Sequence, residues 1–463
     1  MSREALSTNI CSRPRRSLLR GTIVWPALAL LGVLALVIWR QTADSADVAE
    51  PFDVQSFAAI SIPDDQNAFT HYRRAAQHFV DEKVNLAADP SQRLVLSAND
   101  DEVAAKGFQV ANDDCRKWLA ENRLALDLWQ RGSQCSEAIE ITPDDLGLLN
   151  LPDTRPPREL SRLALLEAAR LTAEGSPAQA WEWYRASLRC GRHLGLHAGE
   201  IGRLVGLHIH EQSIPPILRW SADARLSAAD LRRALADTQA AYEMTPPPSE
   251  TIKFEYLSTR ATLKVSFAQP SLADRLRRFP HRLEQAVKLI SANWLSQVDR
   301  PRYLRAPVVE VGNWELFELD AKTPHAANCA PAEIDKQCGL SRRPMQEATQ
   351  GLLMPGVTVF LNAVDRERTR QAALVLGLAL ELYHREHGQF PAALAELVEH
   401  KYLPSIPVDP FGKGEPFHYR READPHQGAT LWSVWLDGID QHGTIPAHPS
   451  APGDMAFQIP RPG

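Results

Sequence analysis

The sequence predicts a mainly α protein with a C-terminal α+β domain, behind a single N-terminal transmembrane helix. Three observations indicate this fold class. Residues 22–39 form an uncharged apolar run, and the middle of the chain carries apolar residues at helical spacing. Residues 365–440 then combine a long apolar helix with turn signals and two strand-like runs. A chain of this length has room for about two to four domains.

The run Thr22–Trp39 is long enough to cross a membrane as a helix. Its 18 residues would rise about 27 Å, close to the thickness of a bilayer core. Arginines dominate the residues before it, and acidic residues follow soon after Arg40. The positive-inside rule therefore places residues 1–21 in the cytoplasm as a basic tail, and everything after Arg40 outside.

We expect residues 22–39 to be an uncleaved single-pass anchor in a bacterial inner membrane, with the C-terminal domains in the periplasm. Two other interpretations remain open. The small residues of Ala43–Ala46 could serve a signal peptidase, which would make the apolar run a cleaved signal. The stretch Arg15–Arg20 resembles a twin-arginine export signal, but we interpret it as a basic cytoplasmic flank.

Charge and cysteine usage narrow the function classes. A net charge of −6 and a pI near 6.2 argue against a nucleic-acid-binding protein, because such proteins are usually basic. Five of the six cysteines would lie in an oxidising compartment, so one of them is left over. Cys329 and Cys338 are close in sequence, and we expect them to form a disulfide.

Residues 40–345 are predicted to form an external helical domain. Its clearest unit is a helical hairpin at 160–196, in which two apolar stripes face each other across the turn at Gly175. The residue spacing is similar to that of a tetratricopeptide repeat, although such arrays need about three units. Further helices are expected over residues 66–80, 115–130, 201–220, 227–242, 249–268 and 283–298.

Recognisable catalytic motifs are absent from the sequence, which contains no nucleophile elbow, phosphate-binding loop, dinucleotide fingerprint or zinc-protease motif. His193 and His197 share a helix face, and a neighbouring helix could add His208 and Glu211 to form a metal site. Partly exposed helix histidines explain the same pattern. His384 and His387 lie at a helix C-terminus, where a positive imidazolium is favoured by the helix dipole.

The C-terminal domain, residues 346–463, is organised around a helix expected over residues 370–386. Its polar residues form one narrow stripe, so other elements must surround most of the helix. Gly388 supplies a left-handed stop, and a short helix follows over 392–399. A turn at 409–412 precedes the two strand-like runs.

This series resembles the globular domain of the major pseudopilin of type II secretion. That family combines a tyrosine-rich helix end, an N/H-G-x-[YF]-P turn, an Asp-Pro-[WF]-Gly turn and a Ser-x-G-x-Asp-Gly loop. The matching residues here, in order, are Tyr383, His387-Gly388-Gln389-Phe390-Pro391, Leu394, Leu397, Asp409-Pro410-Phe411-Gly412, Tyr419, Ser433 and Leu436-Asp437-Gly438. The resemblance implies a pseudopilin-like fold, a long helix with a small antiparallel sheet.

The same resemblance implies a calcium site, because the matching loop of these pseudopilins holds calcium through carboxylates and carbonyls. Carried over to this chain, the ligands would be Asp437, the backbone carbonyl of Ile439, and Asp454 on the returning segment. Calcium takes six to eight oxygen ligands, so further carbonyls and water would have to contribute. An Asp-Gly turn between strands is the alternative for this loop.

Together these features predict a membrane-anchored envelope protein that acts as a non-enzymatic interaction or scaffold component. The resemblance links it to type II secretion or a pilus-like assembly, with protein partners in the cell envelope. The alternative is an exported hydrolase or a metal-dependent enzyme whose site has no recognisable motif.

Overall fold

The computed structural model describes residues 48–80, 99, 102–143, 152–266, 279–305, 357–422, 428–436, 438–445 and 453–459. The predicted membrane segment 22–39, the Cys329–Cys338 disulfide and Asp437 lie outside these residues. Among the helices described, none combines the length and the apolar character needed to cross a bilayer. The described chain is mainly helical with one small antiparallel sheet near its C-terminus, which confirms the fold class at this level.

The N-terminal helices are short. They are α2 (Val54–Ala58), α3 (Ala68–His78), α6 (Asp113–Glu121) and α7 (Arg123–Ser133). The single helix predicted over 115–130 is therefore two helices, and the prediction was wrong at Asn122. The buried side chain of Asn122 accepts a hydrogen bond from Val80 N at 2.8 Å and donates one to Val80 O at 3.1 Å. These bonds tie the break between α6 and α7 to the chain that follows α3.

Four longer helices form an antiparallel array: α8 (Arg155–Ala173), α9 (Pro177–His193), α10 (Glu200–Ser221) and α11 (Ala228–Glu243). The predicted hairpin is α8 and α9, joined at Gly175 with a positive φ of 91°. Helix α8 begins earlier than expected, because prolines are well tolerated in the first turn of a helix. Helices α9 and α10 cross closely: a Cβ on Gly206 would lie only 2.2 Å from Gly191 O.

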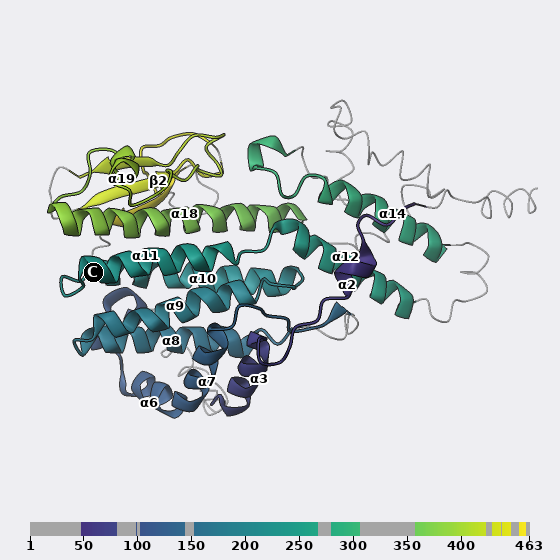
Figure 1. The fold of residues 1–463 in the computed structure, drawn as a ribbon, viewed down its shortest axis with the longest axis horizontal. Coiled ribbons are helices and arrows are strands. Elements are labelled where there is room, and N and C mark those ends of the chain that lie inside the picture. Colours follow the sequence, from purple (N-terminus) through teal and green to yellow (C-terminus); the bar gives the residue numbers. More distant parts are fainter. Residues whose placement is uncertain are drawn as a thin grey trace, which may run out of the picture.

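Helix α18 (Val357–His387) lies between this array and the sheet (Figure 1). It packs on α10 and α11 through one face and on β2 and β3 through the other. At Gly377 both layers approach the helix closely, since a Cβ there would lie 2.6 Å from Leu218 Cδ2 of α10 and 3.3 Å from Ile459 Cδ1 of β3. The helix is therefore surrounded on most sides, as its narrow polar stripe predicts.

The sheet consists of β1 (His418–Arg421), β2 (Ala429–Ser433) and β3 (Met455–Ile459), in the order β1-β2-β3 with both pairs antiparallel. The central strand is buried along its whole length. The short helix α19 (Ala395–Glu399) lies beside the sheet, on the same side of α18 (Figure 1). Gly388, with a φ of 71°, follows the last residue of α18, as predicted.

A second, smaller core lies beyond the array. It is formed by α12 (Pro248–Ser266), α14 (Phe279–Leu295), the N-terminal part of α18 and the segment around α2. Figure 1 shows α12 and α14 extending away from the stacked helices. A 3₁₀ turn at Arg302–Leu304 follows α14.

The main core is continuous from the array to the sheet. Buried side chains of α3, α7 to α11, α18 and all three strands or their flanks belong to one hydrophobic cluster. The predicted domain boundary at 345/346 falls outside the described residues, and α18 beyond it shares its core with α10 and α11. The helical array and the C-terminal sheet therefore stabilise each other through α18.

Candidate functional site

The loop between β2 and β3 is the site that the pseudopilin resemblance implies. Asp454, just before β3, is buried with 1% of its surface exposed. Its Oδ2 accepts hydrogen bonds from Gln441 N at 3.0 Å and Gly443 N at 2.8 Å, and its backbone N–H donates to Thr444 O at 2.7 Å. Asp454 therefore closes the returning loop onto the sheet.

The second carboxylate oxygen of Asp454 has chemistry that fits a cation. Oδ1 is buried and finds no hydrogen-bond partner among the described residues. Asp440 lies in the same loop, and its Oδ1 accepts from Trp432 Nε1 and His442 N, both at 2.8 Å. Of the other two predicted ligands, Ile439 is 61% exposed and Asp437 is outside the described residues. No group of three or more potential metal ligands occurs in the part of the chain that is described.

The turns that carry the resemblance contact one another. Asp409, from the Asp-Pro-Phe-Gly turn, is buried and accepts hydrogen bonds from Phe411 N at 3.0 Å, Ser433 Oγ at 2.7 Å and Val434 N at 3.0 Å. Burial raises the pKa of this carboxyl. Asp409 thus joins its own turn to the end of β2, where the candidate calcium loop begins.

The histidines considered for a metal site serve different partners. His193 is buried between Tyr72 OH at 2.7 Å and Cys135 O at 3.0 Å, and burial lowers its pKa to about 3. His208 is exposed, and Glu211 pairs with Arg370. His197 turns towards Glu250. The structure therefore does not bring these residues together as a metal site. The alternative of partly exposed helix histidines fits His208 but is wrong for His193, which is buried, and for His197, which lies in the turn after α9.

The two histidines at the end of α18 pack on aromatic rings. His384 stacks on Phe390 with ring centres 4.5 Å apart, and His387 lies 4.2 Å from Tyr383. Tyr383 in turn donates a hydrogen bond to Glu396 at 2.6 Å. These contacts fasten the helix end to α19.

Sequence reasoning missed a buried ionic cluster between the array and α18. Glu367 of α18 pairs with Arg192 of α9 and, at 3.1 Å, with Arg203 of α10; all three side chains are at most 3% exposed. Burial alone would raise the pKa of Glu367, but the two arginine charges outweigh it and hold that pKa at about 2. The partners are far apart in sequence, so no local pattern indicates the pairing.

Close to this cluster, two glutamates of α12 hold the turn between α9 and α10. Glu255 Oε1 accepts from Glu200 N at 2.6 Å, and Glu250 Oε1 accepts from His197 N at 2.9 Å. His197 has a φ of 45°, an unusual backbone conformation for a residue other than glycine. The sequence feature that could have indicated these contacts is the group of acidic residues near Pro248.

Burial, with the Glu255 carboxylate beside it, raises the pKa of Glu200 to about 7. A carboxyl whose pKa is raised in the folded state favours folding below its unfolded pKa, and this advantage is lost as the pH rises through about 7. We expect Glu200→Gln to raise the melting temperature at pH 8 and to have little effect at pH 5. Thermal melts of both proteins across this range measure the difference. An equal effect at the two pH values would contradict the assignment.

Comparisons with known proteins add no assignment: no family model, curated protein or solved structure matches this chain.

Proposed function

We propose that this chain is a membrane-anchored envelope protein of a bacterium that acts as a non-enzymatic interaction or scaffold component. The observation that carries the proposal is the position of α18, which is packed between a repeat-like helical array and a small sheet (Figure 1). One continuous core makes the array a support that holds the sheet and its loops in a fixed position. The sequence resemblance to pseudopilins favours a partner linked to type II secretion or a pilus-like assembly.

The buried ionisable groups favour binding over catalysis. The carboxylates of Glu367, Asp365 and Asp409 each form ion pairs or hydrogen bonds with other residues of the chain. The buried histidines His193 and His210 donate to or accept from internal oxygens and are held neutral, since burial lowers both pKa values. Groups fixed in this way hold elements together and are not available to a substrate.

The loop after β2 offers a surface for a protein partner. Three of its apolar side chains are about half exposed or more: Leu436 at 47%, Ile439 at 61% and Ile445 at 66%. Exposed apolar residues concentrated in one short loop are typical of contact surfaces. We therefore place partner binding at this loop, on the side of the sheet that α18 does not cover.

The test is capture of the tagged full-length protein from solubilised membranes after crosslinking in cells. The double substitution Ile439→Asp and Ile445→Asp should weaken recovery of a reproducible partner roughly tenfold, which corresponds to about 1.4 kcal/mol. The matched control is Leu124→Asp on α7, which is 55% exposed and remote from the loop. Equal recovery with all three proteins would contradict a role for the loop.

Calcium would stabilise this loop if it binds there. It would be held by Asp454 and, as proposed from the resemblance, by Asp437 and the carbonyl of Ile439, and it would tie the returning segment to the sheet. We expect the protein to melt at a higher temperature in millimolar calcium than in chelator, because a ligand that binds only the folded state adds stability. Asp437→Ala should remove this difference and leave the melting temperature in chelator nearly unchanged. A plain Asp-Gly turn predicts no dependence on calcium in either protein.

The alternative function is that of an exported hydrolase, and the Glu200–Glu255 pair is the observation that favours it. A carboxyl with a pKa near 7 beside a second carboxylate is an arrangement suited to general acid–base catalysis. One observation opposes a catalytic role for this pair: Glu255 accepts a hydrogen bond from Glu200 N at the first residue of α10, so its carboxylate already has a structural partner. Loss of biological function in Glu200→Gln with unchanged partner capture would favour the enzyme.

A further inference from the structure

The chain that follows the proposed membrane anchor is fastened to the α12–α14 hairpin. Val48 N donates to Gln285 Oε1 at 2.7 Å, and Lys288 Nζ donates to Val48 O at 3.3 Å. Both partners belong to α14. The first described residues of the chain are therefore fixed to one side of one helix.

Glu50 adds a charged connection to both helices of the hairpin. It pairs with Arg260 of α12 at 3.2 Å and with Lys288 of α14 at 3.3 Å, and Tyr256 donates a hydrogen bond to it. The ion pair lies at the edge of the structure, since Lys288 is 9% exposed and Glu50 is 33% exposed.

Aromatic contacts continue this attachment. Phe52 packs edge-on against Tyr256 with ring centres 5.5 Å apart, and Phe57 packs against Phe254 at 5.1 Å. The Lys253 ammonium lies over the rings of Phe52 and Phe57. We call residues 48–58 the strap. Hydrogen bonds, ion pairs and apolar packing together hold the strap to the smaller core.

The length of chain before the strap limits how far it can lie from the bilayer. Trp39 ends the apolar run, and Val48 is nine residues later. A fully extended chain covers at most about 3.3–3.6 Å per residue, so Val48 lies within roughly 30 Å of the end of the anchor. A typical coil of this length is considerably shorter.

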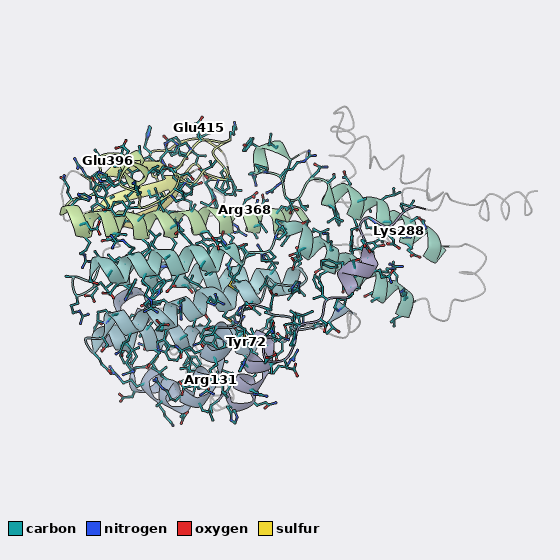
Figure 2. All side chains as sticks on the ribbon, in the orientation of Figure 1. Tyr72, Arg131, Lys288, Arg368, Glu396 and Glu415 are labelled. Carbon is teal, nitrogen blue, oxygen red and sulfur yellow. The ribbon has the colours of Figure 1, made fainter. Side chains whose placement is uncertain are left out.

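We propose that the α12–α14 hairpin is the membrane-proximal part of the molecule, placed against the lipid surface by the strap. This inference rests on the proposed membrane anchoring. Figure 2 labels Lys288 on α14 at one end of the molecule, with Arg131 of α7 and Glu415 near the sheet well away from it. The array and the sheet then extend from the membrane, and the loop after β2 is presented to partners away from the bilayer.

The test measures energy transfer from a fluorescent amino acid to headgroup-labelled lipid in vesicles that contain the full-length protein. The donor is placed at Ala292, an exposed residue of α14 one turn beyond Lys288, and in separate proteins at the exposed residues Arg131 and Glu415. Transfer from Ala292 should exceed transfer from the other two positions by roughly twofold or more, because the short linker limits its distance from the lipid. Equal transfer from the three positions would overturn the proposal.

A lengthened linker supplies the matched control. Insertion of about 30 Gly/Ser residues after Thr42 adds a flexible coil with a root-mean-square length of about 30 Å and leaves the strap contacts unchanged. The excess transfer at Ala292 should then fall towards the values at Arg131 and Glu415. An excess that persists would overturn placement by the strap. A protein that floats free of the vesicles would instead refute the membrane anchoring on which the inference rests.

Discussion

Glu367→Gln should destabilise the protein by about 3–5 kcal/mol, because it leaves two buried arginines without their counter-charge. Arg192 and Arg203 are at most 3% exposed, so water cannot take over the role of the carboxylate. A domain is stable by about 5–15 kcal/mol, so the loss is a large fraction of the total. Denaturant unfolding of residues 48–463 measures the change.

The matched control is Glu211→Gln, which breaks an ion pair of the same type on the same helices. Glu211 pairs with Arg370, but its side chain is 47% exposed, so we expect a cost of no more than about 1 kcal/mol. Equal costs for the two substitutions would show that burial of the Glu367 cluster does not determine its contribution. The pKa of Glu367 near 2 also predicts that its contribution is present above pH 4.5 and is lost only as the pH falls towards 2.

Leu378→Asp should abolish folding of the array and the sheet together. Leu378 is fully buried in the main core, and an unpaired carboxylate at such a position costs several kcal/mol. Its neighbour Gly377 contacts both Leu218 and Ile459, so a defect here disturbs both layers at once. Far-UV circular dichroism follows the helices, and fluorescence of Trp432, with Trp432→Phe as the reference, follows the sheet.

Leu378→Met serves as the control, because a swap that conserves volume usually costs less than about 1.5 kcal/mol. We expect it to melt in one transition, with both signals changing at the same temperature. A Leu378→Asp protein that keeps its native helical signal while the sheet is lost would show that the two parts fold separately.

Local patterns predicted much of the fold. The helices α8 to α11 follow from apolar spacing, and the end of α18 follows from Gly388, because periodicity and helix stops depend on neighbouring residues. The start of α18 did not follow. The helix was expected from residue 370, but it begins at Val357, and Asp365 within it is buried and paired with Arg302 and Arg305. Such pairs join distant segments, which no local pattern records.

The candidate site was predictable only in part. The ordered turns indicated a loop closed by Asp454, and the structure places Asp454 there with one oxygen unpartnered among the described residues. The sequence did not indicate that Asp409 joins the turn at 409–412 to the loop after β2. Its partners Ser433 and Val434 lie at the end of β2, more than twenty residues later in the chain. Nor did it indicate the Glu200–Glu255 pair, which forms only when α10 meets α12.

The membrane topology of the full-length chain tests the central claim most directly. A reporter enzyme that is active only outside the cytoplasm, fused after Gly463, should be active, and the protein should stay in the membrane fraction after a high-salt wash. An inactive reporter, or recovery of the chain as a soluble cytoplasmic protein, would contradict an anchored envelope scaffold.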